Sequence, residues 1–391
     1  MSTTPRMMRL LLSCLLATSS VAKRRVAVRT AAELWSVQQV AAAASGSGGG
    51  CPCTDQSLCQ PITSSKPVME REIYGFGGGD GSSIDFSRVT TVAWASDPKL
   101  MCAAHAAGRR VVMAAPQPEK VFTDNATARA EWVSGTVAAI VNNYMDGIVF
   151  DWESPCEPGA DSQRQYSMLI GETRDALHAL APSYQISTCV AWSPDGIDGR
   201  NYDIPAFAAA SDLLYVMDYD TRSQVVDACV AAANAPYFGM EYGLKRFLGL
   251  GVSPQQLILG VPWYGYRYKC LDGTAPAAHT CPIALVPFRG VNCSDAAGSE
   301  VALEGILMKQ KNSTTGRLWD AYQGAAFFNS VENGSVVQYW YDDVKSLAPK
   351  YAHAKSLGLL GVGPFTFTDT KDQTMYDAFD AFLKDDYKLE L

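Results

Sequence analysis

From residue 73 onward, short apolar runs alternate with longer stretches in which apolar residues recur at helical spacing. Short apolar runs between turn residues predict buried strands, and a period of 3.6 residues predicts amphipathic helices. The expected strands cover residues 73–76, 89–94, 110–115, 147–153, 186–191, 213–217, 257–261 and 359–362. The clearest expected helices cover residues 127–143, 161–180 and 223–233.

Eight strands separated mostly by one helix each are typical of an α/β fold, the (β/α)8 TIM barrel. A doubly wound open sheet is the alternative, but the glycines of FGGGDGSS (76–83) do not match a phosphate-binding loop. The strand–helix rhythm breaks between Val261 and Leu359, over an interval too long for a barrel loop. We therefore expect an inserted subdomain between strands 7 and 8, at about 263–345, on the barrel's C-terminal face.

The first fifty residues resemble a leader more than a part of this fold. Arg6 and Arg9 precede an apolar run at 10–17, and small residues follow through Ala22, as in a secretory signal. A buried helix is the alternative, but the segment ends in the flexible stretch AAAASGSGGG. We expect a leader over 1–50, one domain over 51–391, and no membrane span, because the apolar run is too short to cross a bilayer.

Composition narrows the compartment and the partners. The chain has 391 residues, a net charge of −8 and no long basic run, so nucleic acid is not an expected partner. Its 11 cysteines lack the spacing of a zinc site, which favours disulfides in an oxidising compartment and no metal or other cofactor. We expect a monomer in the lysosome or outside the cell. Glycosylation is expected at four N-x-S/T sequons: Asn125, Asn292, Asn312 and Asn333.

Candidate chemistry is found in the stretch DGIVFDWE, residues 146–153. Alternate side chains of a strand share a face, so the apolar residues at 148, 150 and 152 would pack under the helices. The other set ends in Asp151 and Glu153, at the strand end where barrel enzymes have their active sites. A solvated strand end or a helix cap is the alternative, but two acids on one face favour a catalytic pair.

Two carboxyl groups so close together predict that one of their pKa values is raised. A carboxyl that keeps its proton can protonate a leaving oxygen, as glycoside hydrolysis requires. Acids on the same side of one strand cannot flank the scissile bond as an acid and a nucleophile. The sequence therefore favours a substrate whose own 2-acetamido group attacks the anomeric carbon, as in substrate-assisted glycosidases.

The stretch resembles the catalytic strand of glycoside hydrolase family 18, whose pattern is DGxDxDWE. Two further segments resemble that family: MDYD at 217–220, which matches M-x-Y-D, and GVPWYGY at 260–266. The similarity runs from about residue 51 to the end, and is strongest to the chitobiose-cleaving branch in CPCTDQSLCQPI, LMCAAH, VAWSP, CVAAANAPY, VPFRG and QYWYDD. The resemblance implies a glycosidase acting on β-1,4-linked N-acetylglucosamine, releasing the reducing-end sugar from the chitobiose core of free N-glycan oligosaccharides.

The resemblance also implies catalytic roles, position by position. Glu153 would be the acid, and then the base that activates water. Asp151 would bind the acetamide N–H and stabilise the charge that develops there. Tyr219 would donate its hydroxyl to the acetamide oxygen, and Asp220 would lie beside the same sugar.

Sugar-lining roles follow for Trp192, Met217, Tyr264 and Phe365, although Trp192 and Met217 could instead belong to the barrel core. The chain departs from the family pattern at two positions. Val149 stands where the family has an Asp, and Phe365 takes the place of the Trp that forms the floor of the −1 sugar site.

Two other functions stay open from the sequence. One is an endo-chitinase acting on polymeric chitin, although the sequence contains no separate chitin-binding module. The other is a non-catalytic chitinase-like lectin, which the departures at Val149 and Phe365 favour and the retained Glu153 opposes. For the glycosidase we expect an acidic pH optimum.

Overall fold

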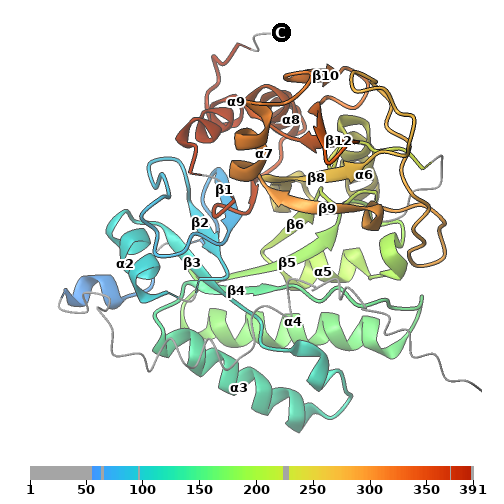
Figure 1. Ribbon diagram of the computed structural model, residues 1–391. Helices are drawn as coiled ribbons and strands as arrows, with labels where there is room; N and C mark the ends of the chain where they lie inside the picture. The colour runs from blue at the N-terminus through green and yellow to red at the C-terminus, as the bar shows by residue number, and fades with distance from the viewer. Residues whose placement is uncertain (1–54, 63–65, 96, 223–228, 370, 389–391) are drawn as a thin grey trace, which may run out of the picture. The chain divides into compact units, whose positions relative to one another are not determined.

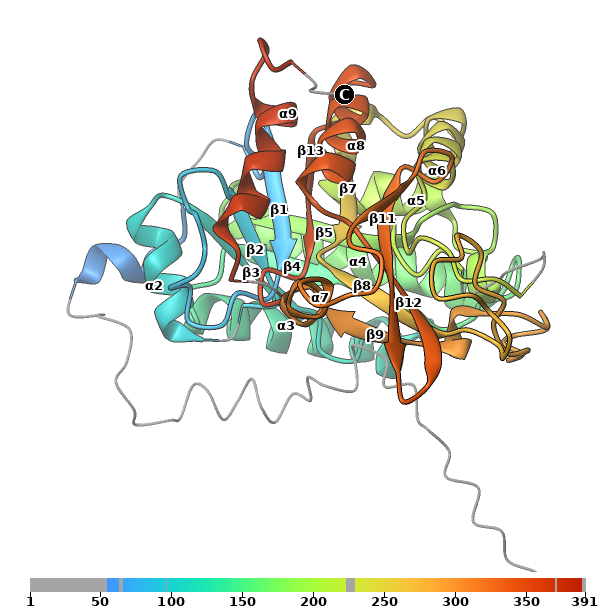
Figure 2. The same cartoon turned by 45° about the horizontal axis from the view of Figure 1, so that its top comes forward.

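Eight parallel strands close into a barrel with the spatial order β1-β13-β7-β6-β5-β4-β3-β2 (Figure 1). The arrangement comes from a computed structural model that describes residues 55–62, 66–95, 97–222, 229–369 and 371–388. The barrel strands are β1 (Glu72–Phe76), β2 (Thr91–Ala93), β3 (Arg110–Ala114), β4 (Gly147–Phe150), β5 (Gln185–Ala191), β6 (Leu213–Met217), β7 (Leu257–Pro262) and β13 (Gly361–Phe365). Figure 2 shows β1, β13 and β7 side by side. The predicted (β/α)8 barrel is confirmed.

Two strands end about three residues away from their predicted ends, and the other predicted strand bounds agree to within about two residues. β4 ends at Phe150, because its pairing with β5 stops there and the backbone N–H of Trp152 donates to the Tyr166 hydroxyl at 3.3 Å. The predicted eighth strand stopped before Pro364, which lacks an N–H. β13 nevertheless continues through Pro364, since β1 pairs with it only as far as Val362 and the missing N–H is not needed there.

Helices surround the barrel on its outer side, and Figure 1 shows α3 and α4 running along β4 and β5. The barrel helices are α2 (Pro98–Ala106), α3 (Ala126–Asn142), α4 (Asp161–Leu180), α5 (Ile204–Ala210), α6 (Tyr237–Gly249), α8 (Val344–Ser356) and α9 (Asp380–Leu383). Short 3-10 turns are η2 (Gln56–Cys59), η3 (Pro118–Val121), η4 (Ile197–Gly199), η5 (Pro254–Gln256), η6 (Asp295–Ala297) and η7 (Gln373–Phe379). Side-chain oxygens begin several of these elements: Asp97 caps α2, and Asn125 caps α3.

The predicted helix over 223–233 is wrong where the structure describes it. Residues 223–228 lie outside the described residues, and 229–233 contain a bridge between Val230 and Pro282 instead of helical turns. A disulfide from Cys229 to Cys293 joins the same segment to the insertion. Small apolar residues gave the segment a helical appearance, but its pairing partners come from beyond β7. The helix of this barrel unit follows as α6.

The predicted insertion between barrel strands 7 and 8 is confirmed as a five-stranded antiparallel sheet in the order β10-β11-β12-β8-β9. Its elements are β8 (Tyr264–Lys269), β9 (Gly298–Ala302), α7 (Leu303–Gln310), β10 (Leu318–Asp320), β11 (Ala325–Glu332) and β12 (Ser335–Tyr341). Phe327 and Trp340 stack in its core with ring centroids 4.6 Å apart. β8, β9 and α7 lie together in both ribbon views (Figures 1 and 2).

Cysteine usage agrees with the expected disulfides. Cys229–Cys293 and Cys270–Cys281 are bridged, and Cys59 and Cys102 are also disulfide-bonded. Cys156 and Cys189 are buried free thiols. Cys51, Cys53 and the expected leader lie outside the described residues.

Two apolar layers define the core. Ile148 and Phe150 of β4 pack under the helices, whereas Val149 faces the barrel interior with Tyr215 and other inward residues, as strand alternation predicts. Gly260 of β7 leaves space for the Tyr215 side chain inside the barrel, since a Cβ at position 260 would lie 2.2 Å from the Tyr215 ring. The barrel is therefore filled by side chains and opens only at its strand ends.

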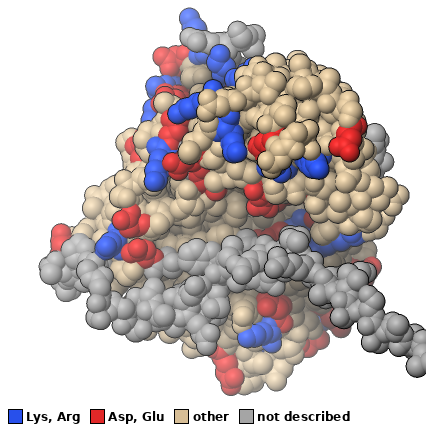
Figure 3. Space-filling model, in the orientation of Figure 1, with Lys and Arg blue, Asp and Glu red and all other residues tan. Residues whose placement is uncertain are grey.

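The described surface shows features relevant to the compartment. All four sequon asparagines are exposed, and their glycosylation stays a prediction. On the face in Figure 3, acidic and basic side chains are interspersed and not gathered into one patch. Within the described ranges, no helix combines the length and apolar character that a bilayer crossing needs.

Candidate active site

The two acids of the DGIVFDWE stretch, Asp151 and Glu153, follow directly on the end of β4. Here tyrosine hydroxyls replace the strand ladder as partners of the backbone. The Tyr202 hydroxyl donates to the carbonyl oxygens of Trp152 at 2.7 Å and Ser154 at 2.8 Å, on either side of Glu153. The Trp152 ring stacks on Tyr202 with centroids 5.4 Å apart. The acids thus lie on a segment that a residue from beyond β5 holds in place.

Asp151 lies deepest in the site. One of its oxygens, Oδ1, is buried and has no hydrogen-bond partner among the described residues. Burial first, and then the charge of Glu153, raise the pKa of Asp151 to about 8, against lowering by Arg200 and by the Cys189 thiol. The expectation that one carboxyl of the pair has a raised pKa is therefore met, and the Asp151–Glu153 pair holds a proton at neutral pH.

Glu153 is held by an arginine. Arg200, which follows η4, donates from Nη1 to Glu153 Oε2 at 2.6 Å, and its Nη2 lies 3.2 Å from Asp198 Oδ2. The Glu153 side chain is 35% exposed and the Arg200 side chain 9%. The more accessible carboxyl of the pair is therefore the one with a cationic partner.

Asp220 is fixed by the insertion and by the segment before α6. Its carboxylate oxygen Oδ1 accepts hydrogen bonds from the hydroxyls of Tyr264 at 2.6 Å and Tyr266 at 3.1 Å, both on β8. Its backbone N–H donates to Asn234 Oδ1 at 2.6 Å. Burial and the charge of Glu300 raise the pKa of Asp220 to about 8, although the Tyr264 hydrogen bond lowers it. The inserted sheet thus completes the site.

Aromatic rings line the mouth of the barrel. Tyr219 stacks on Phe365 of β13, with centroids 5.1 Å apart and planes 27° apart. The Phe365 ring also packs edge-on against two other rings. The centroid distance is 6.2 Å to Tyr264 and 5.5 Å to Trp94. Met217 is buried in the barrel interior with the residues that face inward from neighbouring strands. The structure thus brings Tyr219, Tyr264, Phe365 and Met217 together.

Trp192 lies elsewhere. It belongs to the outward-facing set after β5, and its ring lies 6.4 Å from Tyr242 of α6. Its backbone is so close to α6 that a Cβ on Gly243 would lie 1.9 Å from the Trp192 carbonyl oxygen. Of the two possibilities that the sequence left open, packing in the protein interior agrees with these contacts and sugar lining does not.

Sequence reasoning missed Arg200, Tyr202, Cys189 and Trp94. Arg200 and Tyr202 reach the acids because the chain turns back after β5, where the non-glycine residue Asp198 has φ of +56°. The glycine- and aspartate-rich stretch SPDGIDGR indicates a turn but not which side chain it delivers. Cys189 had an available signal, since it occupies an inward position on β5 near the end of the strand.

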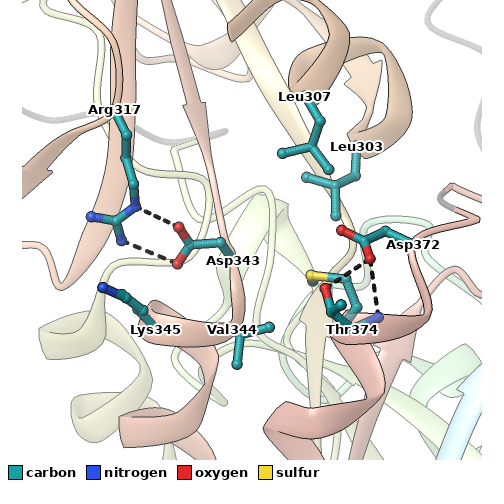
Figure 4. Close-up of a pocket in the computed structure, with 9 residues that line it drawn as sticks. Leu303, Leu307, Arg317, Asp343, Val344, Lys345, Asp372 and Thr374 are labelled. Carbon is teal, nitrogen blue, oxygen red and sulfur yellow. Dashed lines mark hydrogen bonds and ion pairs between the residues drawn. The ribbon is translucent and has the colours of Figure 1, made fainter. Parts of the chain in front are cut away.

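Two further observations concern possible metal ligands and a second cavity. No group of three or more His, Cys, Asp or Glu residues in the described part of the chain is arranged to hold a metal ion. A pocket of about 200 Å³ lies apart from the acids, between α7, the start of α8 and η7, and Figure 4 shows the Arg317–Asp343 pair on its wall. None of its lining residues belongs to the predicted site.

This barrel with acids at its mouth defines a class. Residues 76–369 match the pattern of glycosyl hydrolases family 18, and the chain belongs to that family. The class is therefore that of a glycoside hydrolase. Among solved structures, a GH18 chitinase from Cycas revoluta in complex with (GlcNAc)3 is similar in fold, with a TM-score of 0.66 and 18% identity over 80% of this chain and 99% of that one.

More specific relatives are the di-N-acetylchitobiases. The chain is 39% identical to that of Rattus norvegicus over 316 residues, covering 80% of this chain and 85% of the relative. It is 38% identical to that of Homo sapiens over 319 residues, covering 81% and 82%. A probable di-N-acetylchitobiase 2 of Dictyostelium discoideum is 37% identical over 354 residues, covering 85% and 91%.

Proposed function

We propose that this glycoside hydrolase cleaves the β-1,4 bond of chitobiose units and releases the reducing-end N-acetylglucosamine. The observation that supports the proposal is the placement of Asp151 and Glu153 at the end of β4 beside an aromatic surface, where burial and the charge of Glu153 raise the pKa of Asp151. The similarity to di-N-acetylchitobiases favours chitobiose, in the core of free N-glycan oligosaccharides, over polymeric chitin.

The proposed mechanism is substrate-assisted and retaining. Glu153 donates the shared proton to the glycosidic oxygen while the carbonyl oxygen of the 2-acetamido group attacks the anomeric carbon. Asp151, left ionised, accepts a hydrogen bond from the acetamide N–H and offsets the positive charge of the oxazolinium. Glu153 then takes a proton from water, which opens the intermediate and retains the anomeric configuration.

The residues from β6, β8 and β13 bind the same sugar in this proposal. Tyr219 donates its hydroxyl to the acetamide oxygen, and Asp220 binds a hydroxyl of the ring. Phe365 offers an apolar surface to the pyranose, with Tyr264 beside it and Met217 below. Because Phe365 is smaller than Trp, we expect weaker binding of the sugar and no change in the chemistry.

Val149 removes the third acid that the family pattern places below Asp151. In its absence the Cys189 thiol is the polar group that contacts the inner side of Asp151. We propose that the pair still titrates as one unit that holds a single proton. We further propose a compartment reached by the secretory pathway, the lysosome or the outside of the cell, since the described disulfides suit an oxidising environment.

Turnover of a chitobiose-containing oligosaccharide by wild type and Glu153→Gln tests the function, with products read by mass spectrometry and anomeric NMR. We expect release of one reducing-end sugar, retained configuration, and a loss of at least roughly 100-fold in kcat in the variant. Glu157→Gln is the matched control, because Glu157 is an exposed acid four residues farther along the same segment. Binding without turnover by wild type would indicate a lectin, and equal rates in Glu153→Gln would remove Glu153 from the acid role.

A further inference from the structure

Arg200 is a charged residue in direct contact with Glu153 that the proposed mechanism leaves unused. Its guanidinium bridges two carboxylates, with Nη1 at 2.6 Å from Glu153 Oε2 and Nη2 at 3.2 Å from Asp198 Oδ2. Its Nε also donates to the carbonyl oxygen of Ile197 at 3.3 Å. A cation that is almost fully buried and so held is a built part of the site, unlike a surface arginine.

The backbone fixes the direction in which Arg200 points. Asp198 has a left-handed φ of +56°, which only a few non-glycine residues adopt, and this turn brings the loop back toward β4. The N–H of Cys156 then donates to Gly199 O at 2.9 Å, and the N–H of Asn201 donates to Cys156 O at 3.2 Å. The arginine and the segment that follows the catalytic acid are therefore joined by main-chain hydrogen bonds.

Charges and titratable groups face Glu153 from several elements. Besides Arg200, they are Asp151 after β4, Cys189 on β5, Tyr202 before α5 and Tyr219 after β6. Of these described groups, Arg200 is the one cation, and the others are acids or neutral donors. A second guanidinium, that of Arg289, donates to the backbone carbonyl oxygen of Asp198 at 2.6 Å, so Arg200 is the cation in direct contact with Glu153.

Building on the proposed glycosidase function, we propose that Arg200 is a positioning residue that fixes the Glu153 carboxylate and sets the pH range over which the Asp151–Glu153 pair keeps its proton. A guanidinium in contact with a carboxylate favours the ionised form, and Arg200 lowers the pKa of Asp151, so the pair loses its proton at a lower pH than it would without Arg200. The same contact helps the second half of the reaction, in which Glu153 must be ionised to activate water.

Asp198 explains how the arginine can release Glu153 without penalty to the fold. When Glu153 becomes protonated, Arg200 keeps a carboxylate partner, and no buried cation is left unpaired. The two acids therefore compete for one guanidinium. Removal of Arg200 and removal of Asp198 should therefore move the pH dependence of activity in opposite directions.

The test compares the alkaline limb of the kcat/KM profile in three variants, with a chitobiose-containing oligosaccharide as substrate. In Arg200→Gln we expect the limb to move to higher pH by about one unit, so that kcat/KM at pH 9 relative to pH 5 rises roughly 5-fold. In Asp198→Asn the limb should move to lower pH, because the cation is shared with one acid fewer. Arg200→Lys should keep the limb near that of wild type and lower kcat, since an ammonium lacks the fork that spans two carboxylates.

A second readout needs no substrate. The carboxyl carbon-13 signals of Asp151 and Glu153, assigned with Asp151→Asn and Glu153→Gln, are titrated in wild type and in Arg200→Gln, and the midpoint of the pair should rise in the variant. If wild type cleaves no oligosaccharide but the midpoint rises, the proposed function fails while Arg200 keeps its electrostatic role. An unchanged limb and midpoint in Arg200→Gln would overturn the inference, as would an equal shift in Arg200→Lys. Should Arg200→Gln fail to fold by circular dichroism, the other two variants decide. A limb that moves to lower pH in Asp198→Asn and stays in place in Arg200→Lys supports the inference, and an equal shift in both variants contradicts it.

Discussion

The Tyr219 side chain has a ring that packs against Phe365 and a hydroxyl that is available for catalysis. Its ring stacks on Phe365, and among the described residues no hydrogen bond occupies its hydroxyl. Burial raises the pKa of that hydroxyl well above its usual range, and the nearby acids Asp151 and Glu153 raise it further. The phenol therefore stays a proton donor at every pH at which the enzyme would work.

Tyr219→Phe removes only the hydroxyl, so we expect kcat to fall by about 100-fold while the melting temperature changes little. The magnitude is that of one hydrogen-bond donor to a developing charge. Tyr322→Phe is the matched control, because Tyr322 is 78% exposed in the turn between β10 and β11. Steady-state kinetics and thermal unfolding of both variants are the measurements. A large loss of stability in Tyr219→Phe would mean that the hydroxyl supports the fold.

At the scale of the element, the segment at 229–236 connects the insertion to the site. Asn234 accepts a hydrogen bond from the backbone of Asp220, and the carbonyl oxygen of Ala235 accepts one from Lys350 at 2.6 Å. Cys229 is bridged to Cys293 in the insertion. The segment has no regular secondary structure, so side-chain hydrogen bonds and a covalent bond maintain its position.

The two described disulfides should therefore differ in their contribution to stability. Cys229–Cys293 closes a loop with a sequence separation of 64, and Cys270–Cys281 one of 11. Loop-closure entropy predicts a cost of about 4 kcal/mol for replacing the first pair by Ala and about 3 kcal/mol for the second. Urea unfolding of the two double variants measures the difference. Loss of the first pair should also lower kcat/KM, and a larger cost for the second would contradict the prediction.

An element is predicted accurately from the sequence when its own residues determine its bounds, and poorly when a distant pairing partner does. α4 and β6 match their predicted bounds because their own side chains state the period. The extent of β13 depends on where its neighbour stops pairing, and the segment at 229–233 depends on a bridge to residue 282. Such partners are distant along the chain, and no local pattern reports them.

The candidate site divides in the same way. The acids, the M-x-Y-D motif and Phe365 lie at strand ends, where alternation and strand order predict a shared mouth. Arg200 and Tyr202 arrive through a turn whose course depends on a left-handed residue, Asp198. Predicting them would have required the path of that loop in three dimensions.

At the scale of the whole molecule, buried acids make the fold sensitive to alkaline pH. Asp218 lies between β6 and α8 with both carboxyl oxygens buried and without hydrogen-bond partners among the described residues. Burial raises its pKa to about 7, against the lowering by Lys350. Burial also raises the pKa of Asp295 to about 7, as it does for Asp220. The charge of Asp295 also raises the pKa of Asp220, so these two groups act together, whereas Asp218 lies beside Lys350 and Asp342.

The sign of the effect follows from linkage. An acid whose pKa is higher in the folded than in the unfolded chain costs nothing at low pH, where both states are protonated. Between about pH 4 and pH 8 the unfolded state ionises first, and stability falls. We expect the free energy of unfolding to be larger at pH 5 than at pH 8, which suits an acidic compartment.

Asp218→Asn should reduce that difference by roughly 2–4 kcal/mol, because an amide does not ionise. Urea unfolding at pH 5 and pH 8 measures it. Asp385→Asn is the control, since Asp385 is exposed and hydrogen bonds from Lys355 and Arg71 lower its pKa to about 2. That control should leave the fall between pH 5 and pH 8 as it is. An unchanged fall in Asp218→Asn would show that other acids cause it.

The Tyr202 hydroxyl, which binds the carbonyl oxygens on either side of Glu153, bears on how this chemistry could be transplanted. A designer who copied the sequence DGIVFDWE into another barrel would obtain the two acids without the Tyr202 hydrogen bonds that orient their backbone. The smallest portable unit is therefore a pair of consecutive strand-and-loop modules, running from β4 to the tyrosine beyond β5. Within such a unit, α4 would have to keep Tyr166, whose hydroxyl accepts from the N–H of Trp152, and the two loops could change only together.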